Sequence, residues 1–407
     1  TTVFDANNQA VASIDALDQR TTSVYDAAGR VTTVTDPLGD SIQNIYDDAS
    51  RLIATIDPLG YRTTTVYDAA SRPIAVRDAQ NNLTTTVYDA AGREIATIDA
   101  LNGRTTSVYD AASRLIATID PLGRRTTSVY DAAGQVIETI NPETEVTTTV
   151  YDSAGRQTES VNPLGNVTTT VYDDADRVIA SIDPLGHRIS SVYDKASQVI
   201  AEINPLGDRT TTVYDAVGRE QSMIDAENQR TTYQYDAVGQ QVQMEDPLQR
   251  ISTTVYDANG QVVRQIDALN GVTTAVYDAA GRQIASINPL GERTTTIYNA
   301  NSWVTATVDA LNERTTFQYD ELGQQTVSID PLVYRTSTTY DALGRDIRIT
   351  NARSFMTTTI YDAASQPVIS IDAIAGRTTT TFDLAGRVIR TADPLNQIST
   401  NVYDAAG

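Results

Sequence analysis

The chain has 407 residues, a formal net charge of -22, one histidine and no cysteine. The lack of cysteine excludes disulfides, thiolate metal sites and a cysteine nucleophile. The surplus of carboxylates argues against a nucleic-acid partner, because phosphate binding needs clustered Lys and Arg. No stretch approaches the roughly 18–20 apolar residues that a membrane span requires, so no membrane span is expected.

An aromatic residue followed by Asp, or once by Asn, recurs every 21 residues along the whole chain. Its 20 copies run without insertion or deletion. Residues 1–407 are therefore interpreted as a single tandem array of about 19 repeats, partial at each end, with no separate globular domain. Because the chain begins and stops inside a repeat, we expect it to be a segment of a longer polypeptide. The predicted structural ladder of aromatic residues includes Tyr25, Tyr46, Tyr67, Tyr88, Tyr109, Tyr130, Tyr151 and Tyr172.

Each repeat contains two predicted turns, as residues 277–297 illustrate. The segments 278–281 and 288–291 both carry Asp or Asn first and Gly fourth, and the second also carries Pro in second place. This is the chemistry of a type I turn followed by a residue with positive φ. The turn residues that carry this prediction are Asp57, Pro58, Gly60, Asp278, Gly281, Asn288, Pro289 and Gly291.

The segments between the turns, 282–287 and 294–298 in the same repeat, are rich in Thr, Val, Ile and Tyr and predict strands. Of the 13 prolines, all but Pro73 and Pro367 lie in the second turn, and these two are placed at the start of a strand. Turns about every ten residues leave no room for parallel crossovers. The predicted fold class is all-β: a continuous antiparallel meander of hairpin repeats with about 38–40 strands.

So many strands must coil, because open twisted sheets curl or split beyond roughly ten strands. Large apolar groups are expected on both faces, which favours a thin wall with ladders of like side chains over a sandwich. Ile284 and Ile287 either point to opposite faces or flank a β-bulge. Successive coils would meet by backbone pairing or by side chains. The unbroken period favours a uniform hollow spiral tube over a closed shell.

The carboxylates of the first turn are candidates for a Ca²⁺ ladder, represented by Asp68, Asp89, Asp110 and Asp131. The alternative is turn capping through hydrogen bonds, and no other cofactor is expected. Every Asp of this kind has about 19 near-equivalents, whereas paired catalytic carboxylates need distinct environments. No catalytic residue is therefore predicted, and the chain is not expected to be an enzyme.

Other columns of the repeat are interpreted as parts of the wall. Arg30 and its equivalents interchange with Gln, which indicates a hydrogen-bond donor to the neighbouring Asp. Arg62 and its equivalents interchange with Leu and Val, as expected where a stem packs and the charged head reaches water. His187 lies in a variable turn position, and Trp303 is interpreted as an isolated surface substitution.

The run Tyr-Asp-Ala-Ala-Gly-Arg at 25–30 and 277–282, together with Asp-Pro-Leu-Gly at 57–60, resembles the YD-repeat, or RHS-repeat, family. Its members include bacterial polymorphic toxins, toxin-complex cocoon components and the animal teneurins. The resemblance implies hairpins that spiral into a hollow shell, an enclosed passenger polypeptide and an extracellular or cell-surface location. The self-cleaving Asp-Pro-x-Gly-Leu signature of the toxins has no match here, so protease function is not carried over.

Three functions follow as hypotheses. The first is a non-enzymatic, self-associating wall of an extracellular tube, filament or stalk, whose partner is another copy or the continuation of a longer repeat chain. The second is a fragment of an RHS toxin cocoon that encloses a passenger polypeptide. The third is a multivalent adhesion or glycan-binding surface.

Overall fold

The computed structural model describes residues 1–406, which form one antiparallel sheet of 39 strands. Each strand pairs with the strands before and after it in the sequence, as in the pairs β6 with β7 and β27 with β28. Among the described residues there is no helix that could cross a membrane. The predicted all-β meander is confirmed.

Two kinds of strand alternate along the chain. The odd-numbered strands end on the aromatic residue, except for β39, and they are β1 (Thr2–Phe4), β3 (Arg20–Tyr25), β5 (Ser41–Tyr46), β7 (Arg62–Tyr67), β9 (Leu83–Tyr88), β11 (Arg104–Tyr109), β13 (Arg125–Tyr130), β15 (Val146–Tyr151), β17 (Val167–Tyr172), β19 (Arg188–Tyr193), β21 (Arg209–Tyr214), β23 (Arg230–Tyr235), β25 (Ile251–Tyr256), β27 (Val272–Tyr277), β29 (Arg293–Tyr298), β31 (Arg314–Tyr319), β33 (Arg335–Tyr340), β35 (Met356–Tyr361), β37 (Arg377–Phe382) and β39 (Ile398–Thr400). The even-numbered strands are β2 (Ala10–Ile14), β4 (Val31–Thr35), β6 (Leu52–Ile56), β8 (Pro73–Arg77), β10 (Glu94–Ile98), β12 (Leu115–Ile119), β14 (Val136–Ile140), β16 (Gln157–Val161), β18 (Val178–Ile182), β20 (Val199–Ile203), β22 (Glu220–Ile224), β24 (Gln241–Glu245), β26 (Val262–Ile266), β28 (Gln283–Ile287), β30 (Val304–Val308), β32 (Gln325–Ile329), β34 (Asp346–Thr350), β36 (Pro367–Ile371) and β38 (Val388–Ala392).

A β-bulge sits beside the aromatic residue in each repeat. In the pair β27 and β28, Val276 is opposite Ala285 and Tyr277 is opposite Gln283, so Ile284 is the extra residue. The bulge therefore explains the spacing of Ile284 and Ile287. We name the turn after the aromatic residue (278–281 in this repeat) the tyrosine turn, and the other (288–291) the proline turn.

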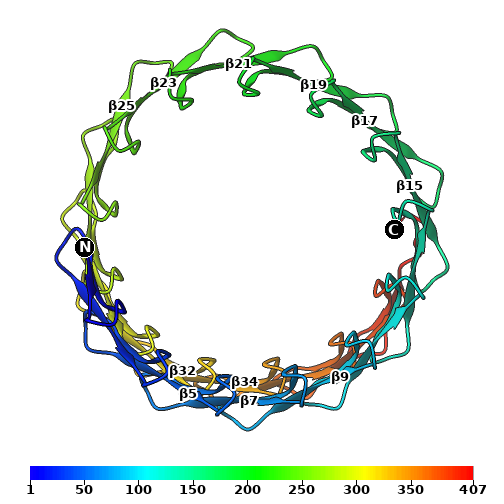
Figure 1. Ribbon diagram of the computed structural model, residues 1–407, viewed down its shortest axis with the longest axis horizontal. Helices are drawn as coiled ribbons and strands as arrows, with labels where there is room; N and C mark the ends of the chain where they lie inside the picture. The colour runs from blue at the N-terminus through cyan, green and yellow to red at the C-terminus, as the bar shows by residue number, and fades with distance from the viewer. Residues whose placement is uncertain (407) are drawn as a thin grey trace.

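The sheet winds into a spiral. Figure 1 shows a circular wall around an open centre, with β32 and β34 lying along the same arc as β5 and β7. Side-chain contacts between coils join residues 241–244 positions apart. Dividing this offset by the 21-residue period gives about 11.5 repeats per turn, so the chain completes roughly 1.7 turns. The predicted spiral is confirmed.

Successive coils meet at their turns. Proline turns of the first coil, from Asp15 onward, face tyrosine turns of the second coil, from Asp257 onward. Because the described strands pair with their sequence neighbours, this contact, which we call the seam, is made by turns and side chains and not by a β-ladder.

The wall is one layer thick. Its buried apolar side chains are small, with one column contributing nearly all of them: Ala12, Ala54, Ala96, Ala117, Ala180, Ala201, Ala285, Ala306, Val327 and, elsewhere, Ala392. Ala54, for example, lies between Ile45 and Thr64 of the flanking strands. Since no second layer covers either face of the wall that residues 1–406 form, cross-strand contacts and the turns must supply most of the stability.

Candidate functional site

Each turn is closed by the carboxylate or amide of its first residue. Asp68 Oδ1 accepts hydrogen bonds from the amides of Ala70 and Arg72 at 2.9 and 3.0 Å. At the proline turn, Asp57 Oδ1 accepts from the amides of Leu59 and Tyr61 at 3.0 and 2.8 Å. The fourth turn residues Gly60, Gly281 and Gly291 have φ of 89°, 78° and 80°. The predicted turn residues thus lie where such turns place them.

The arginine that follows a tyrosine turn connects one repeat to the next. Arg51 Nε donates to Asp47 Oδ2 at 2.7 Å, and Arg51 Nη1 donates to the carbonyl of Asp68 in the following repeat at 3.0 Å. The guanidinium carbon lies 5.0 Å from the ring centre of Tyr67, within cation–π distance. One side chain therefore binds a carboxylate, a carbonyl and an aromatic face.

The tyrosine hydroxyls form a second connection between repeats. Tyr67 donates to the carbonyl of Leu52, 15 residues earlier, at 3.0 Å. Burial raises the pKa of the Tyr214 and Tyr319 hydroxyls, which donate in the same way to the carbonyls of Val199 and Val304 at 3.0 and 2.7 Å. The same bond is made by all the tyrosines assigned to the ladder: Tyr25, Tyr46, Tyr67, Tyr88, Tyr109, Tyr130, Tyr151 and Tyr172.

Glutamine replaces the arginine as a neutral donor. Gln135 Nε2 donates to the carbonyl of Gly155 in the next repeat at 3.0 Å, and Gln198 and Gln261 make the equivalent bond at 3.0 and 2.8 Å. These contacts explain why the column interchanges Arg with Gln. The Arg repeats add an ion pair and a cation–π contact to the same link.

The carboxylates proposed for calcium are occupied by the chain itself. In Asp68, Asp89 and Asp110, Oδ2 accepts from the arginine Nε at 2.7 Å. Hydrogen bonds from the arginine backbone amide, and then from its side chain, hold the pKa of these carboxyls below the usual range. Asp131 Oδ1 accepts from the amide of Gln135 at 2.9 Å. Calcium binding stays a prediction, and in the first three units the cation would have to displace a guanidinium.

Within residues 1–406, no three acidic or histidine side chains converge in a way that could hold a metal ion. The single histidine, His187, is exposed at a proline turn, with Nδ1 2.8 Å from Asp183 Oδ2. It therefore closes its own turn.

The two faces of the wall differ in charge. Residues Arg62, Thr64 and Val66 share one face with the buried alanines, because Arg62 is opposite Ile56 and Thr64 is opposite Ala54. Arginine occupies the first position of eleven odd-numbered strands, always on this face: Arg20, Arg62, Arg104, Arg125, Arg188, Arg209, Arg230, Arg293, Arg314, Arg335 and Arg377.

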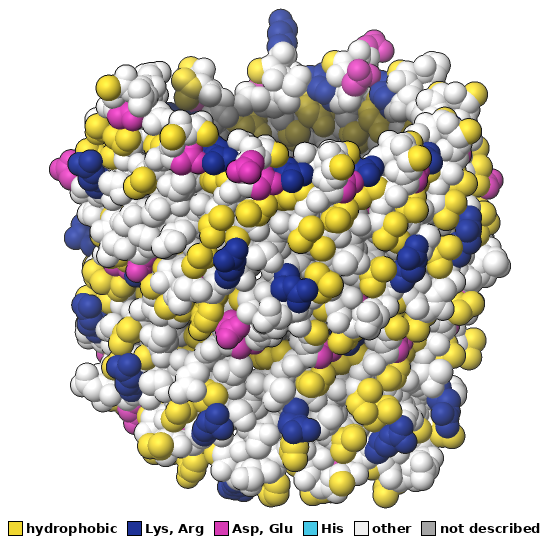
Figure 2. Space-filling view, turned by 60° about the horizontal axis from the view of Figure 1, so that its bottom comes forward, with side chains coloured by type: hydrophobic (Ala, Val, Ile, Leu, Met, Phe, Trp, Pro, Cys, Tyr) yellow, Lys and Arg dark blue, Asp and Glu magenta, His cyan; other side chains and the backbone are white. Residues whose placement is uncertain are grey.

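The opposite face carries the tyrosines and rows of Thr and Ser, such as Thr63 and Thr65 of β7. Away from the bulges, Glu202 is its one charged residue in the described strands. Figure 2 shows basic side chains spread over the outer wall, which places the arginine face outside. The lumen is therefore lined by hydroxyls and aromatic rings with little charge.

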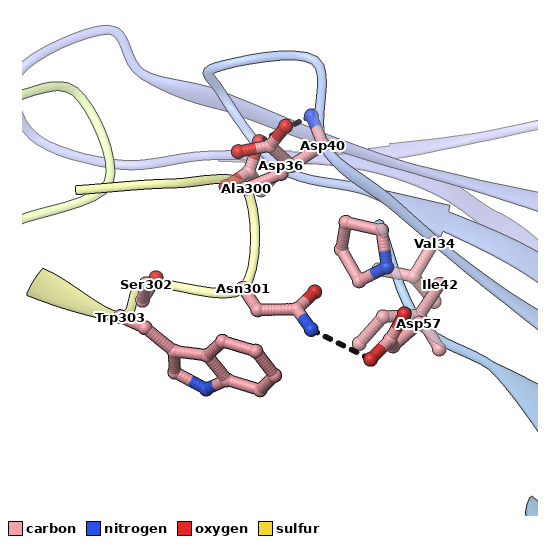
Figure 3. Close-up of a pocket in the computed structure, with 10 residues that line it drawn as sticks. Val34, Asp36, Asp40, Ile42, Asp57, Ala300, Asn301, Ser302 and Trp303 are labelled. Atoms are coloured by element: carbon pink, nitrogen blue, oxygen red, sulfur yellow. Dashed lines mark hydrogen bonds between the residues drawn. The ribbon is translucent and has the colours of Figure 1, made fainter. Parts of the chain in front are cut away.

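The seam brings together residues that are far apart in the sequence and that the 21-residue period does not predict to be in contact. Asn301 Nδ2 donates to Asp57 Oδ2 across the seam at 2.6 Å (Figure 3). Asn259 makes the matching bond to Asp15 at 2.7 Å. Beside Asn301, a crevice of about 400 Å³ is lined by Asp36, Asp57 and Trp303, among others.

Trp303 was expected to be an isolated surface substitution, and this interpretation is wrong. Its ring stacks on Tyr61 of the first coil, with centroids 6.2 Å apart and planes 15° apart. It also contacts Tyr319 of the next repeat, with centroids 5.5 Å apart. Trp303 thus stands where other repeats have Arg or Gln, and it makes an aromatic contact across the seam.

Trp303→Gln is expected to weaken the seam by about 1–2 kcal/mol, because it removes an aromatic pair and its contact area. Glutamine is native to this column at Gln261, so the turn itself should stay intact. The amides of residues 57 and 59–61 should then exchange hydrogen roughly 5–30-fold faster. The control Gln198→Ala, away from the seam, should leave those rates unchanged. Equal exchange rates in the two variants would show that the contact between Trp303 and Tyr61 does not hold the coils together.

The comparisons with known proteins agree with this geometry. A family model described as RHS repeat matches residues 4–41, 46–87, 88–125, 109–149, 130–167, 151–188, 214–251, 256–295 and 298–332. No curated protein matches the chain.

Solved structures share the fold. The chain resembles TcdB2-TccC3-TEV with a TM-score of 0.79 and 15% identity, over 97% of this chain and 27% of that one. A Tc holotoxin pore from Photorhabdus luminescens gives a TM-score of 0.76 and 15% identity, over 96% and 26% of the two chains. TcdB2-TccC3 gives 0.74 and 16%, over 97% and 28%. The chain thus spans about a quarter of the length of these neighbours.

The repeated tyrosine turn, the one-layer spiral and the family matches over most of the sequence lead to the same assignment. This chain belongs to the RHS repeat family.

Proposed function

We propose that the chain is a non-enzymatic wall segment of a hollow RHS shell, located outside the cell, that encloses a passenger polypeptide. The observation that carries the proposal is the circular, spiral course of the wall, with about 11.5 repeats per turn around an open centre (Figure 1). The fold similarity to TcdB2-TccC3 structures supports it.

The chemistry of the lumen suits an unfolded passenger. Such a chain exposes charged, polar and apolar groups together, and a strongly charged wall would bind part of it tightly. Thr and Ser hydroxyls on β7 and its equivalents offer weak hydrogen bonds, and the fixed charges lie mainly outside and at the turns. The wall would then confine the passenger without holding any one segment.

Site-specific photo-crosslinking tests this proposal. A photo-reactive phenylalanine derivative is placed at position 65 or at position 66, which are neighbours on β7 that point to opposite faces. Reduced, carboxymethylated lactalbumin serves as the unfolded probe. Crosslinking from position 65 should exceed that from position 66 by at least about tenfold, corresponding to roughly 1.4 kcal/mol of preference. Equal crosslinking from both positions would overturn the proposal.

A second candidate function is the wall of an extensible extracellular tube. The constant radius in Figure 1 and the unbroken 21-residue period favour it. Electron microscopy separates the two candidates, since a tube gives fibres of uniform width whereas a shell gives particles of limited length.

A further inference from the structure

The spiral has two free edges that correspond to the two sides of the seam. The upper rim consists of the proline turns from 183–186 to 393–396, which no tyrosine turn within residues 1–406 covers. The lower rim consists of the tyrosine turns from 5–8 to 236–239. Each rim follows about one full turn of the spiral.

The exposed fraction of the third residue of each proline turn depends on whether a coil lies above that turn. In the seam, Leu17, Leu59 and Leu164 are 40%, 40% and 48% exposed. On the upper rim, the equivalent residues are 71–87% exposed: Leu185, Leu206, Leu248, Leu269, Leu290, Leu311, Leu332, Ile374 and Leu395. A stacked coil thus covers close to half of the exposed surface of each such side chain. On the rim, a row of apolar side chains at the same turn position is left uncovered.

The lower rim offers the matching surface. Nine of its twelve turns have alanine as the third residue. The others have Asn7, Val217 and Val238, and the two valines are 75% and 82% exposed. In the seam, the equivalent residues Leu322 and Leu343 are partly buried against the coil below. The chain therefore carries both halves of a contact that it already makes once within itself.

We propose that the upper rim of one spiral docks on the lower rim of a second copy of this chain, so that spirals stack coaxially. The interface repeats the seam over a full turn, with eleven proline turns on the upper rim in place of the shorter overlap inside the chain. This stacking is independent of whether the lumen holds a passenger.

The charges predict how salt affects stacking. Each copy carries a net charge of -22, and rim carboxylates such as Asp225 and Asp267 approach the second copy. Most lower-rim turns have alanine where the seam has Asn259 or Asn301, so they lack these donors. Apolar contact opposed by repulsion should strengthen with salt, because screening weakens the repulsion.

Sedimentation velocity of the full chain between low and high salt tests the proposal, with the variant Leu206→Glu, Leu269→Glu, Leu290→Glu. Glutamate is native to this turn position at Glu227, so the variant should fold. The wild type should form coaxial stacks that grow with salt, and the variant should raise the dissociation constant at least about 100-fold, or roughly 2.7 kcal/mol.

The matched control is Arg264→Glu, Arg348→Glu, at exposed positions in the middle of β26 and β34, on the face of the buried alanines and away from the rims. It should stack like the wild type. A wild type that stays monomeric at high salt overturns the proposal. So does association that the rim variant leaves unchanged, which would instead indicate pairing of terminal strands.

Discussion

Tyr193→Ala is expected to lower the free energy of unfolding of the central repeats by about 2–4 kcal/mol. The substitution removes the ring beneath Arg177, whose guanidinium carbon lies 4.7 Å from the ring centre. It also removes the hydroxyl that donates to the carbonyl of Val178 at 2.8 Å. Because each repeat contacts chiefly its neighbours, the loss concentrates at one junction of the array.

The readout is urea unfolding followed by hydrogen exchange. We expect the single transition of the wild type to split, with residues near 193 opening at lower urea than the rest. Tyr193→Phe is the matched control, since it keeps the ring and loses the hydroxyl bond at a cost of about 1 kcal/mol. An alanine variant that unfolds like the wild type would show that the ladder is not the main link between repeats.

Acidification is expected to loosen the wall in many repeats together. Hydrogen bonds from the arginine amide, and then from the arginine side chain, lower the pKa of Asp26, Asp47 and Asp68. A carboxyl whose folded pKa is depressed contributes stability above its unfolded value of about 4, and this contribution is lost as pH falls through the folded pKa. Stability should therefore fall steeply below about pH 4.

The test is circular dichroism in urea between pH 7 and pH 2. The variant Arg72→Gln, Arg93→Gln, Arg114→Gln replaces three ion-paired donors by the neutral donor found at Gln135. It should be less stable at pH 7 and should lose less stability between pH 4 and pH 2. The hypothesis fails if variant and wild type lose the same amount over that interval.

The fold was largely predictable because its determinants lie within one repeat. Asp278 and Gly281 specify a turn, and the segment after it specifies a strand, without reference to distant residues. The bulge at Ile284 could not be assigned from the sequence, because a bulge and simple alternation both accommodate the spacing to Ile287.

The seam was not predictable for a different reason. A turn of about 11.5 repeats corresponds to roughly 31° of rotation per repeat, and a change of a few degrees in strand twist would bring other residues into contact. The pairing of Trp303 with Tyr61 depends on this accumulated angle. The one available signal was that Trp303 is the single tryptophan, while Tyr61 is one of three aromatic residues in its own column, with Tyr334 and Phe355.

The contacts across the seam also depend on the number of repeats between the residues that meet. Asn301 reaches Asp57 and Trp303 reaches Tyr61 only while the 21-residue units between them keep their number. Deleting one unit between the two turns would leave each hairpin intact, yet it would set Trp303 above Asp40 in place of Tyr61. The number of repeats in one turn of the spiral therefore determines which residues meet across the seam. The loss or gain of a single repeat would change the partner of every residue in the contacts beyond it.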